Sequence, residues 1–437
     1  AAGGGSAGSV GATTAGLTPD VVAVTLGPLD LVVVDSLETA LHTHFGWSRF
    51  RAGQRPVVEA VLSGRDALAV LPTGGGKSLC YQLPALIRGG LVVVISPLVA
   101  LMEDQVLQLR RRGIAAACLH AGLDPARRQQ AMAALRDESL RLLYLAPERL
   151  QGEATQRLLE THAAEGRLVA LAVDEAHCIS AWGHDFRPDY RRLGLIRRLC
   201  PGVPMLALSA TAAPRVRADI LRLLDLRSPL VQVSSARREN LRYAMQRRPR
   251  DPMPQVLEAL EQSRGATLIY ARTRRSVEHW AERLQGESVE ATPYHAGLDP
   301  ATRQTALTQF LEQERPVLVA TVAFGMGVDR GDVGLVLHLD LPSTPEGYLQ
   351  ESGRAGRDGQ PARCLVLFSP GDRTSLGWAM QAAAGRGSNP DERHRLDLAQ
   401  QQLRRMEAVA EGEMCREQAL LLAVGELVDP CGRCDRC

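Results

Sequence analysis

Residues 68–80 constrain the fold more than any other stretch. They read Leu-Ala-Val-Leu-Pro-Thr-Gly-Gly-Gly-Lys-Ser-Leu-Cys. The apolar residues 68–71 predict a buried strand, and the proline and glycines that follow predict a turn. The apolar run opened by Lys77 and Ser78 predicts a helix. A glycine-rich turn between a strand and a helix N-terminus is a phosphate cradle, because backbone N–H groups and the helix dipole converge on an anion.

This pattern predicts a nucleotide site. The strict pattern G-x-x-x-x-G-K-[ST] fails at its first position, which is Leu71, and the variant Thr-Gly-Gly-Gly-Lys-Ser at 73–78 resembles the phosphate-binding loops of helicases. Lys77 is the only lysine in the sequence, which suggests that the site needs a compact ammonium rather than a planar guanidinium. We expect Lys77 to neutralise phosphate charge and Ser78 to bind Mg²⁺. A glycine-rich turn with an exposed lysine is the alternative. The expected cradle residues are Thr73, Gly74, Gly75 and Gly76.

Length and composition set broad limits. The 437 residues allow about three domains, and the formal net charge of +2 neither requires nor excludes nucleic acid. No apolar run approaches the ~18 residues that span a bilayer. Five of the nine cysteines are isolated and four cluster at the C-terminus, which fits a reducing intracellular location. The sequence begins without Met and without a secretory signal, so we expect a fragment.

A second chemical motif follows another apolar strand. Residues 168–173 are apolar, and Asp174, Glu175 and His177 come directly after them. A carboxylate at a strand end beside a phosphate-binding loop completes a Mg²⁺ site. We expect Asp174 to hold the ion, Glu175 to deprotonate the attacking water, and His177 to link this site to its surroundings.

An aromatic and polar stretch lies just upstream of the phosphate-binding loop. Trp47 and Arg51 are suited to stacking on the two faces of a base, and the Gln54 amide to hydrogen bonding with the adenine edge. Core packing is the alternative for these three residues, and it is the interpretation we adopt for Phe45 and Phe50.

Two further stretches suggest nucleic-acid contacts. The predicted strand 91–95 ends at Ser96, which would lie at the same sheet edge as the phosphate-binding loop. Residues 178–190 combine aromatic and basic side chains in a loop, which suits base stacking and phosphate contact. A packed loop is the alternative. The candidate residues of this loop are Trp182, His184, Phe186 and Arg187.

Alternating strands and helices start again near residue 234 and predict a second α/β domain. It carries Gln350, Arg354 and Arg357. Two arginines three positions apart would lie on one face of a helix, from which an arginine finger could reach a nucleotide held by the first domain. The alternative is a solvated basic turn. Residues 371–390 predict a linker, and 391–409 a helix.

The C-terminal cysteines predict a metal site. Cys415 is followed after fifteen residues by Cys431, Cys434 and Cys437, in C-x₂-C-x₂-C spacing. Four thiolates fit tetrahedral Zn²⁺ with no open position, so the site would be structural. Free or disulfide-bonded cysteines are the alternative.

Together these residues resemble the RecQ family of superfamily 2 DNA helicases over about residues 38–437. The most specific matches are residues 50–54, 72–82, 174–190 and 350–359 and the four cysteines. The resemblance implies an α/β fold with two tandem RecA-like parallel-sheet domains and a small helical zinc-binding domain. It also implies Asp329 as a ribose contact. The expected boundaries are a flexible tail at 1–35, RecA-like domains at 36–233 and 234–375, and the zinc-binding domain at 376–437.

The resemblance implies an ATP-dependent 3′→5′ translocase and helicase acting in DNA repair and recombination. ATP, Mg²⁺ and Zn²⁺ would be its small-molecule partners, and single-stranded and partly duplex DNA its substrates. We expect a monomer in the cytoplasm or nucleoid, without membrane contact. Family members commonly continue into a winged-helix domain, whereas this sequence stops at Cys437, so motor activity is expected and duplex unwinding is left open. An RNA-directed helicase and a non-catalytic DNA-binding fragment remain alternatives.

Overall fold

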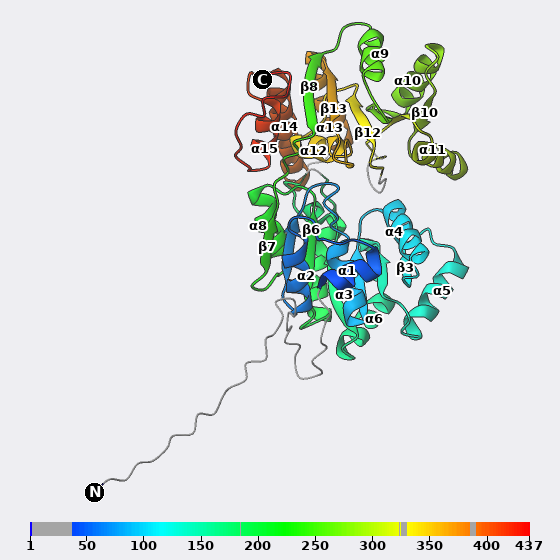
Figure 1. The fold of residues 1–437 in the computed structure, drawn as a ribbon, viewed down its shortest axis with the longest axis vertical. Coiled ribbons are helices and arrows are strands. Elements are labelled where there is room, and N and C mark those ends of the chain that lie inside the picture. Colours follow the sequence, from blue (N-terminus) through cyan, green and yellow to red (C-terminus); the bar gives the residue numbers. More distant parts are fainter. Residues whose placement is uncertain (2–36, 184, 323, 325–329, 385–389) are drawn as a thin grey trace.

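The computed structural model describes residues 1, 37–183, 185–322, 324, 330–384 and 390–437. Within them, two β-sheets, each of parallel strands, lie in separate lobes with their helices. A helical segment with the cysteine cluster lies beside the second sheet (Figure 1). The expected fold class is therefore confirmed. Residues 2–35 of the predicted tail, together with His184 and Asp329, lie outside the described residues. No helix of the described chain has the length and apolar character needed to cross a bilayer.

The first sheet has seven parallel strands in the order β3-β4-β2-β5-β6-β1-β7. Their bounds are β1 Ala67–Val70, β2 Leu91–Ile95, β3 Ala116–Leu119, β4 Leu142–Leu145, β5 Leu168–Val173, β6 Met205–Ser209 and β7 Leu230–Val233. The strands predicted at 68–71, 91–95 and 168–173 are confirmed within one residue. Because all strands run parallel, the loops after β1, β2 and β5 meet at one edge of the sheet.

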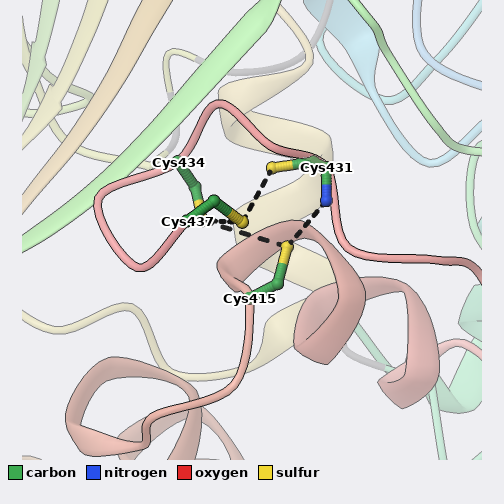
Figure 2. Close-up of side chains that lie close together, drawn as sticks. All are labelled: Cys415, Cys431, Cys434 and Cys437. Atoms are coloured by element: carbon green, nitrogen blue, oxygen red, sulfur yellow. Dashed lines mark hydrogen bonds between the residues drawn. The ribbon is translucent and has the colours of Figure 1, made fainter.

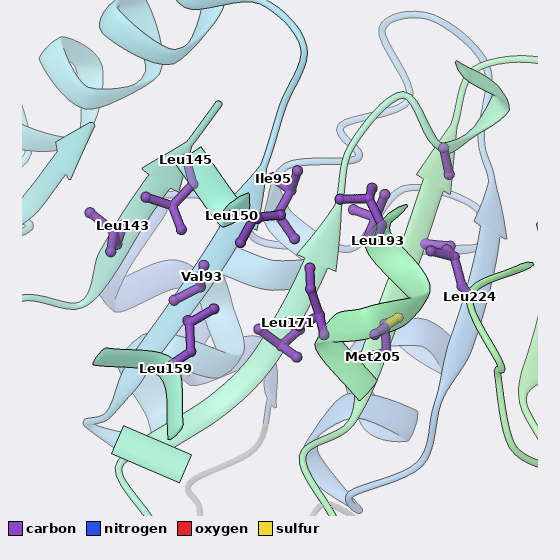
Figure 3. Close-up of a cluster of buried hydrophobic side chains, with 14 of the residues drawn as sticks. Val93, Ile95, Leu143, Leu145, Leu150, Leu159, Leu171, Leu193, Met205 and Leu224 are labelled. Atoms are coloured by element: carbon purple, nitrogen blue, oxygen red, sulfur yellow. The ribbon is translucent and has the colours of Figure 1, made fainter. Parts of the chain in front are cut away.

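Helices cover both faces of this sheet. They are α1 Leu37–Phe45, α2 Gln54–Leu62, α3 Leu79–Arg88, α4 Val99–Arg111, α5 Pro125–Arg136, α6 Glu153–Ala164, α7 Ile196–Leu199 and α8 Pro214–Leu223, with 3₁₀ turns at Pro147–Gln151, Ala176–Ile179 and Pro188–Leu195. Alternate strand residues enter two different cores, as Val93 and Val94 of β2 illustrate. Figure 3 shows the core that contains Val93, Leu171 and Met205.

A buried ion pair fixes the start of β1. The Asp66 carboxylate pairs with Arg197 and accepts hydrogen bonds from the backbone N–H groups of Met205, at 2.8 Å, and Arg227, at 2.7 Å. Both charged side chains are buried. Since these bonds join the beginnings of β1 and β6 to the approach to β7, Asp66 sets the register of the strand that ends in the phosphate-binding loop.

The second sheet has six parallel strands in the order β10-β11-β9-β12-β13-β8. They are β8 Leu241–Arg247, β9 Ala266–Tyr270, β10 Ala291–Tyr294, β11 Val317–Ala320, β12 Val333–His338 and β13 Ala362–Phe368. The accompanying helices are α9 Met253–Glu261, α10 Arg274–Gly286, α11 Pro300–Glu312, α12 Pro345–Ser352, α13 Pro370–Ala384, α14 Pro390–Glu411 and α15 Arg416–Ala423. The linker predicted at 371–390 is wrong for residues 371–384, which are helical because Pro370 starts a helix and alanines continue it.

The cysteine segment covers the edge of this sheet. β8 is one of the two edge strands of this sheet. Asp435 accepts a hydrogen bond from the Met245 N–H at 2.9 Å, and its own N–H donates to the Tyr243 carbonyl at 3.2 Å. Figure 1 shows α14 and α15 beside β8. An edge strand otherwise presents unpaired backbone groups, so this segment protects it. The predicted boundary at 376 lies inside α13, and the domain limits remain predictions.

Candidate active site

The phosphate-binding loop connects β1 to α3, as the sequence predicts. Gly74 and Gly76 have φ angles of 78° and 73°, in the left-handed region that favours glycine. A Cβ atom at Gly75 would lie 2.8 Å from the Pro72 carbonyl oxygen. Each of the three glycines therefore meets a backbone requirement of the loop.

The residues predicted to recognise adenine border this loop. The buried Gln54 side chain donates from Nε2 to the carbonyl oxygens of Gly75, at 3.1 Å, and Gly76, at 3.0 Å, and its Oε1 accepts from the Arg51 N–H at 2.8 Å. The Arg51 guanidinium donates to the Gly74 carbonyl. In this structure Gln54 and Arg51 thus hold the shape of the phosphate-binding loop.

Trp47 is placed to form a platform. Its ring stacks on Phe45 with centroids 5.4 Å apart and an angle of 20° between the planes, and Arg112 lies over it at 5.8 Å. The Trp47 side chain is 44% exposed and lines the same cleft as the glycine loop. An aromatic ring with open surface beside a phosphate site can stack on a base.

The acidic pair follows β5, as predicted. Burial, and then the charge of Glu175, raise the pKa of Asp174 to about 7, while Lys77 opposes this shift. The Asp174 carboxylate accepts from the Glu175 N–H at 3.0 Å, and Tyr190 donates to the Asp174 carbonyl at 2.9 Å. Glu175 has φ 47°, an uncommon conformation for a residue with a side chain. A buried carboxylate that resists ionisation is suited to binding a divalent cation, whose charge would offset the desolvation.

His177 connects the acidic pair to β6. Its Nδ1 lies 3.1 Å from Ser209 Oγ and 3.3 Å from Glu175 Oε2. Because the Ser209 hydroxyl donates to the Thr211 carbonyl at 2.7 Å, its oxygen accepts from His177, which puts the ring proton on Nδ1. His177 thus contacts both Glu175 and the last residue of β6, and its linking role stays a prediction.

Residues of the second lobe complete the cleft. Gln350 Nε2 lies 3.5 Å from Glu175 Oε1. A Cβ atom at Gly74 would lie 3.4 Å from Arg357 Cγ, and one at Gly353 would lie 3.1 Å from Thr73 Cβ. The cleft of about 710 Å³ is lined by both lobes, including Lys77, Ser78, Asp174, Glu175, Gln350, Arg354 and Arg357.

The helical placement expected for the two arginines is wrong. α12 ends at Ser352, and Arg354 and Arg357 lie in the turn that follows. Gly353, Gly356 and Gly359 occupy this turn, and glycines end helices readily. The turn nevertheless lies close to the first lobe, since a Cβ atom at Gly353 would be 3.1 Å from Thr73 Cβ.

The aromatic loop after the acidic pair is packed against α14. Arg215 lies over the Trp182 ring at 3.2 Å, and His394 contacts its edge at 5.9 Å. Phe186 has Arg191 at 5.0 Å and Arg395 at 5.7 Å. Both rings are partly exposed. The packed alternative therefore describes this conformation, and the partners of both rings are cationic or imidazole side chains.

The two remaining candidates for nucleic-acid contact lie close together. Arg187 pairs with Asp185 at 3.0 Å and donates to the Pro97 carbonyl at 2.9 Å, next to Ser96. Among the described residues, the buried Ser96 hydroxyl has no hydrogen-bond partner. The loops after β2 and β5 therefore adjoin, as the parallel sheet predicts.

The four C-terminal cysteines form one cluster (Figure 2). Their sulfur atoms all lie within 4.8 Å of one another, and three pairs lie between 3.4 and 3.9 Å. Tetrahedral Zn–S bonds of ~2.3 Å require sulfurs ~3.8 Å apart, so the cluster fits Zn²⁺. The backbone N–H groups of Cys431 and Arg416 donate to the sulfurs of Cys415 and Cys434. Burial raises the pKa of Cys431 to about 12, so a bound cation would be what stabilises the thiolates.

Sequence reasoning missed residues that support the site rather than line it. Asp66, Arg238 and Asn240 make side-chain hydrogen bonds to backbone groups far along the chain. A single polar residue at the end of a strand or linker carries no local signal for such a partner. Only the arrangement of the sheets brings these groups together.

Three family models match consecutive parts of the chain. The DEAD/DEAH box helicase family matches residues 51–220, the helicase conserved C-terminal domain matches 251–359, and the RecQ zinc-binding family matches 370–437. The first range contains strands β1 to β6, the second contains β9 to β12, and the third contains the four cysteines, while β7, β8 and β13 lie outside the three ranges.

Two curated relatives are identical to this chain at about two fifths of the aligned residues. An "ATP-dependent DNA helicase RecQ" of Pasteurella multocida is 40% identical over 91% of this chain and 61% of its own length. A "Probable ATP-dependent DNA helicase RecS" of Bacillus subtilis is 40% identical over 77% of this chain and 67% of its own length. The chain thus spans about three fifths of the first of these relatives.

A solved structure, "DEAD-box helicase Mss116 bound to ssRNA and UDP-BeF", has a TM-score of 0.64 and 16% identity, covering 84% of this chain and 81% of its own. At this identity the likeness supports the fold alone.

Proposed function

Because this chain belongs to the RecQ family of ATP-dependent DNA helicases, we propose that it hydrolyses ATP when single-stranded DNA is bound and uses the free energy to move 3′→5′ along DNA. The observation that most directly supports this proposal is that Arg357 of the second lobe lies against Gly74 in the phosphate-binding loop of the first lobe. A cleft with nucleotide-binding groups on one wall and arginines on the other is complete only when the lobes are together. Hydrolysis can therefore be coupled to their opening and closing.

In this proposal the cleft divides the chemistry between its two walls. The backbone of Gly74–Gly76 and the Lys77 ammonium would bind the β- and γ-phosphates, and Ser78 and Asp174 would hold Mg²⁺, which supplies charge neutralisation on the phosphate oxygens. Glu175 would take the proton of the attacking water. The bond between the β- and γ-phosphates breaks, water adds to the γ-phosphorus, and ADP and phosphate leave.

The arginines of the second lobe would stabilise the charge that develops in the transition state. Arg354 and Arg357 both line the cleft, and positively charged groups placed there act where negative charge accumulates on the transferred phosphoryl group. Gln350, which lies 3.5 Å from Glu175, would align that carboxylate with the water. Trp47 would stack on the base.

The aromatic loop would couple DNA to hydrolysis. It begins shortly after the acidic pair, so a base that stacks on Trp182 or Phe186 contacts the same loop that follows Glu175. Ser96 and Arg187, on adjoining loops, would contact the DNA backbone. DNA binding would replace the present side-chain partners of the rings on α14.

The cysteine cluster would hold Zn²⁺ as a structural ion, since four thiolates leave no position for substrate. We further propose a monomer that acts on single-stranded and partly duplex DNA in repair and recombination, in the cytoplasm or nucleoid. Duplex unwinding is a separate question from translocation, because translocation needs only the two-lobed cleft and a DNA contact.

The test is ATP hydrolysis at fixed Mg²⁺ with no nucleic acid, with single-stranded DNA and with single-stranded RNA. We expect a large rise with DNA alone, and Trp182→Ala should remove this rise while leaving the basal rate within about threefold. Trp378→Ala is the matched control, because Trp378 lies on α13 with its side chain 69% exposed. Equal stimulation by RNA would favour an RNA-directed helicase, and no hydrolysis by folded protein would favour a binding module.

A further inference from the structure

The turn that carries Arg354 and Arg357 lies beyond the end of its helix. α12 ends at Ser352, and Gly356 has φ 55°. The carbonyl groups that follow a helix C-terminus have no partner within the helix and need donors from elsewhere. The position of both arginines therefore depends on what holds this turn.

One donor is local, the Gly359 N–H, which lies 3.1 Å from the Gly356 carbonyl oxygen. The side-chain donors come from the segment between the two sheets. The Arg238 guanidinium donates from Nη2 to the Gly356 carbonyl at 2.6 Å and to the Ala355 carbonyl at 3.3 Å. Arg238 lies between β7 and β8, more than a hundred residues before the turn. A cation beside carbonyl groups at the end of a helix also interacts favourably with the helix dipole.

Asn240 holds the same carbonyl from a second side. Its Nδ2 donates to Gly356 at 2.8 Å and to Gln360 at 2.7 Å, and its Oδ1 accepts from Arg238 Nε at 3.3 Å. A Cβ atom at Gly356 would lie 2.4 Å from Asn240 Nδ2. The glycine is thus required both for its φ angle and for the approach of this amide.

The cysteine segment contacts the same linker. Arg433, between Cys431 and Cys434, donates to the backbone carbonyls of Leu241, at 3.0 Å, and Arg238, at 3.1 Å. Its guanidinium is held by the buried Glu417, whose carboxylate oxygens lie 2.6 and 2.8 Å away. A continuous series of hydrogen bonds therefore runs from the cysteine cluster to the arginine turn.

We propose that Arg238, together with Asn240, is a positioning residue for ATP hydrolysis, and that Arg433 connects this support to the cysteine cluster. The inference rests on the proposed function, because it assigns a role in the same reaction. Arg238 does not touch the reacting atoms. It fixes the backbone from which Arg354 and Arg357 reach the cleft, and a displacement of about 1 Å at a reacting centre can reduce a rate about 100-fold.

The test uses the full chain and two readouts. Backbone amide exchange is measured over residues 353–362, where the Gly356 and Asp358 N–H groups donate to the carbonyls of Val333 and Gly331, respectively. Steady-state hydrolysis is measured with saturating single-stranded DNA. Arg238→Ala should speed exchange in this segment and lower kcat about 10- to 100-fold, with KM for ATP changed less than about threefold.

Two further substitutions separate positioning from folding. Arg238→Lys keeps a cationic donor and should restore part of kcat. Asn240→Asp keeps the size but replaces the donor by an acceptor, so it should behave like Arg238→Ala and serves if that variant does not fold. Arg242→Ala, an exposed arginine on β8, is the matched control and should leave both readouts unchanged.

Unchanged exchange over 353–362, or an unchanged kcat in Arg238→Ala, would overturn the proposal. A parallel loss of thermal stability and of ATP affinity would indicate a general structural role and would also overturn it. Wild-type protein that does not hydrolyse ATP would instead refute the proposed function, while amide exchange would still decide whether Arg238 holds the turn.

Discussion

Replacing Gln54 tests whether this side chain sets the shape of the phosphate-binding loop. Its Nε2 donates to two carbonyl groups of the loop, at 3.1 and 3.0 Å. Each such bond contributes about 0.5–1.5 kcal/mol net. Gln54→Ala should therefore reduce the free energy that holds the loop in this shape by about 1–3 kcal/mol. If the loop must regain its shape to bind nucleotide, affinity falls about 5- to 150-fold.

Gln54→Glu should lower nucleotide affinity more than Gln54→Ala does at neutral pH. The substitution has nearly the same size but puts a carboxylate oxygen where Nε2 now lies, facing the carbonyl oxygens of Gly75 and Gly76. Burial and these oxygens would raise the pKa of the new carboxyl above its ordinary value of ~4.3. The protonated form, which can donate, predominates below the raised pKa, so affinity should recover as the pH falls and be lost as it rises.

The assay is calorimetric titration with a non-hydrolysable ATP analogue at fixed Mg²⁺, between pH 5.5 and 8.5. Each variant is compared with wild-type protein at the same pH, because Asp174, with a pKa of about 7, also titrates in this range. Gln108→Ala, an exposed glutamine on α4, is the control. Equal affinities of the Ala and Glu variants at pH 8, or no recovery of the Glu variant at low pH, would refute the reasoning.

Three other predictions concern different parts of the molecule. Lys77→Ala and Lys77→Arg should both abolish hydrolysis without changing the melting temperature, because a planar guanidinium cannot replace the ammonium; residual hydrolysis in either would contradict the assignment. Removal of zinc by a chelator, checked by metal analysis, should lower the melting temperature. It should also speed amide exchange in β8, since Asp435 is hydrogen-bonded to that strand. Unchanged exchange in β8 would argue against a structural metal. Asp66→Ala should destabilise the first lobe by about 3–5 kcal/mol, because it leaves Arg197 buried without its partner. Urea unfolding measures this change, and a loss of stability below about 1 kcal/mol would show that water reaches Arg197.

The sequence predicted central strands better than peripheral ones. β1, β2 and β5 are continuous apolar runs that are buried on both faces, and such runs are typical of parallel sheets. The edge strands β3 and β10 have the sequences Ala-Ala-Cys-Leu and Ala-Thr-Pro-Tyr, which lack a run of large apolar residues. They were not predicted, because an edge strand needs fewer apolar residues. β13 was also missed, although its residues 364–368 are apolar.

Candidate residues were predicted where chemistry depends on local spacing. The glycine loop, the acidic pair and the four cysteines each fall within a few residues or follow a metal-binding spacing, and the structure brings each group together. The helix expected for Arg354 and Arg357 is wrong because the glycines around the two arginines determine the local backbone, whereas the spacing of the two charges does not. Three glycines in seven residues are the stronger signal, since each favours the end of a helix.

The arrangement of the supports bears on how the two halves of the cleft cooperate. The groups on the first wall are held within the first lobe, by Gln54 and Asp66. The arginines on the second wall are held by Arg238 and Asn240, which belong to the segment joining the lobes. A change in the relative orientation of the lobes must move this segment, because it connects them. We therefore expect the arginine turn to respond to lobe movement directly, so that domain closure would align the arginines with the phosphates.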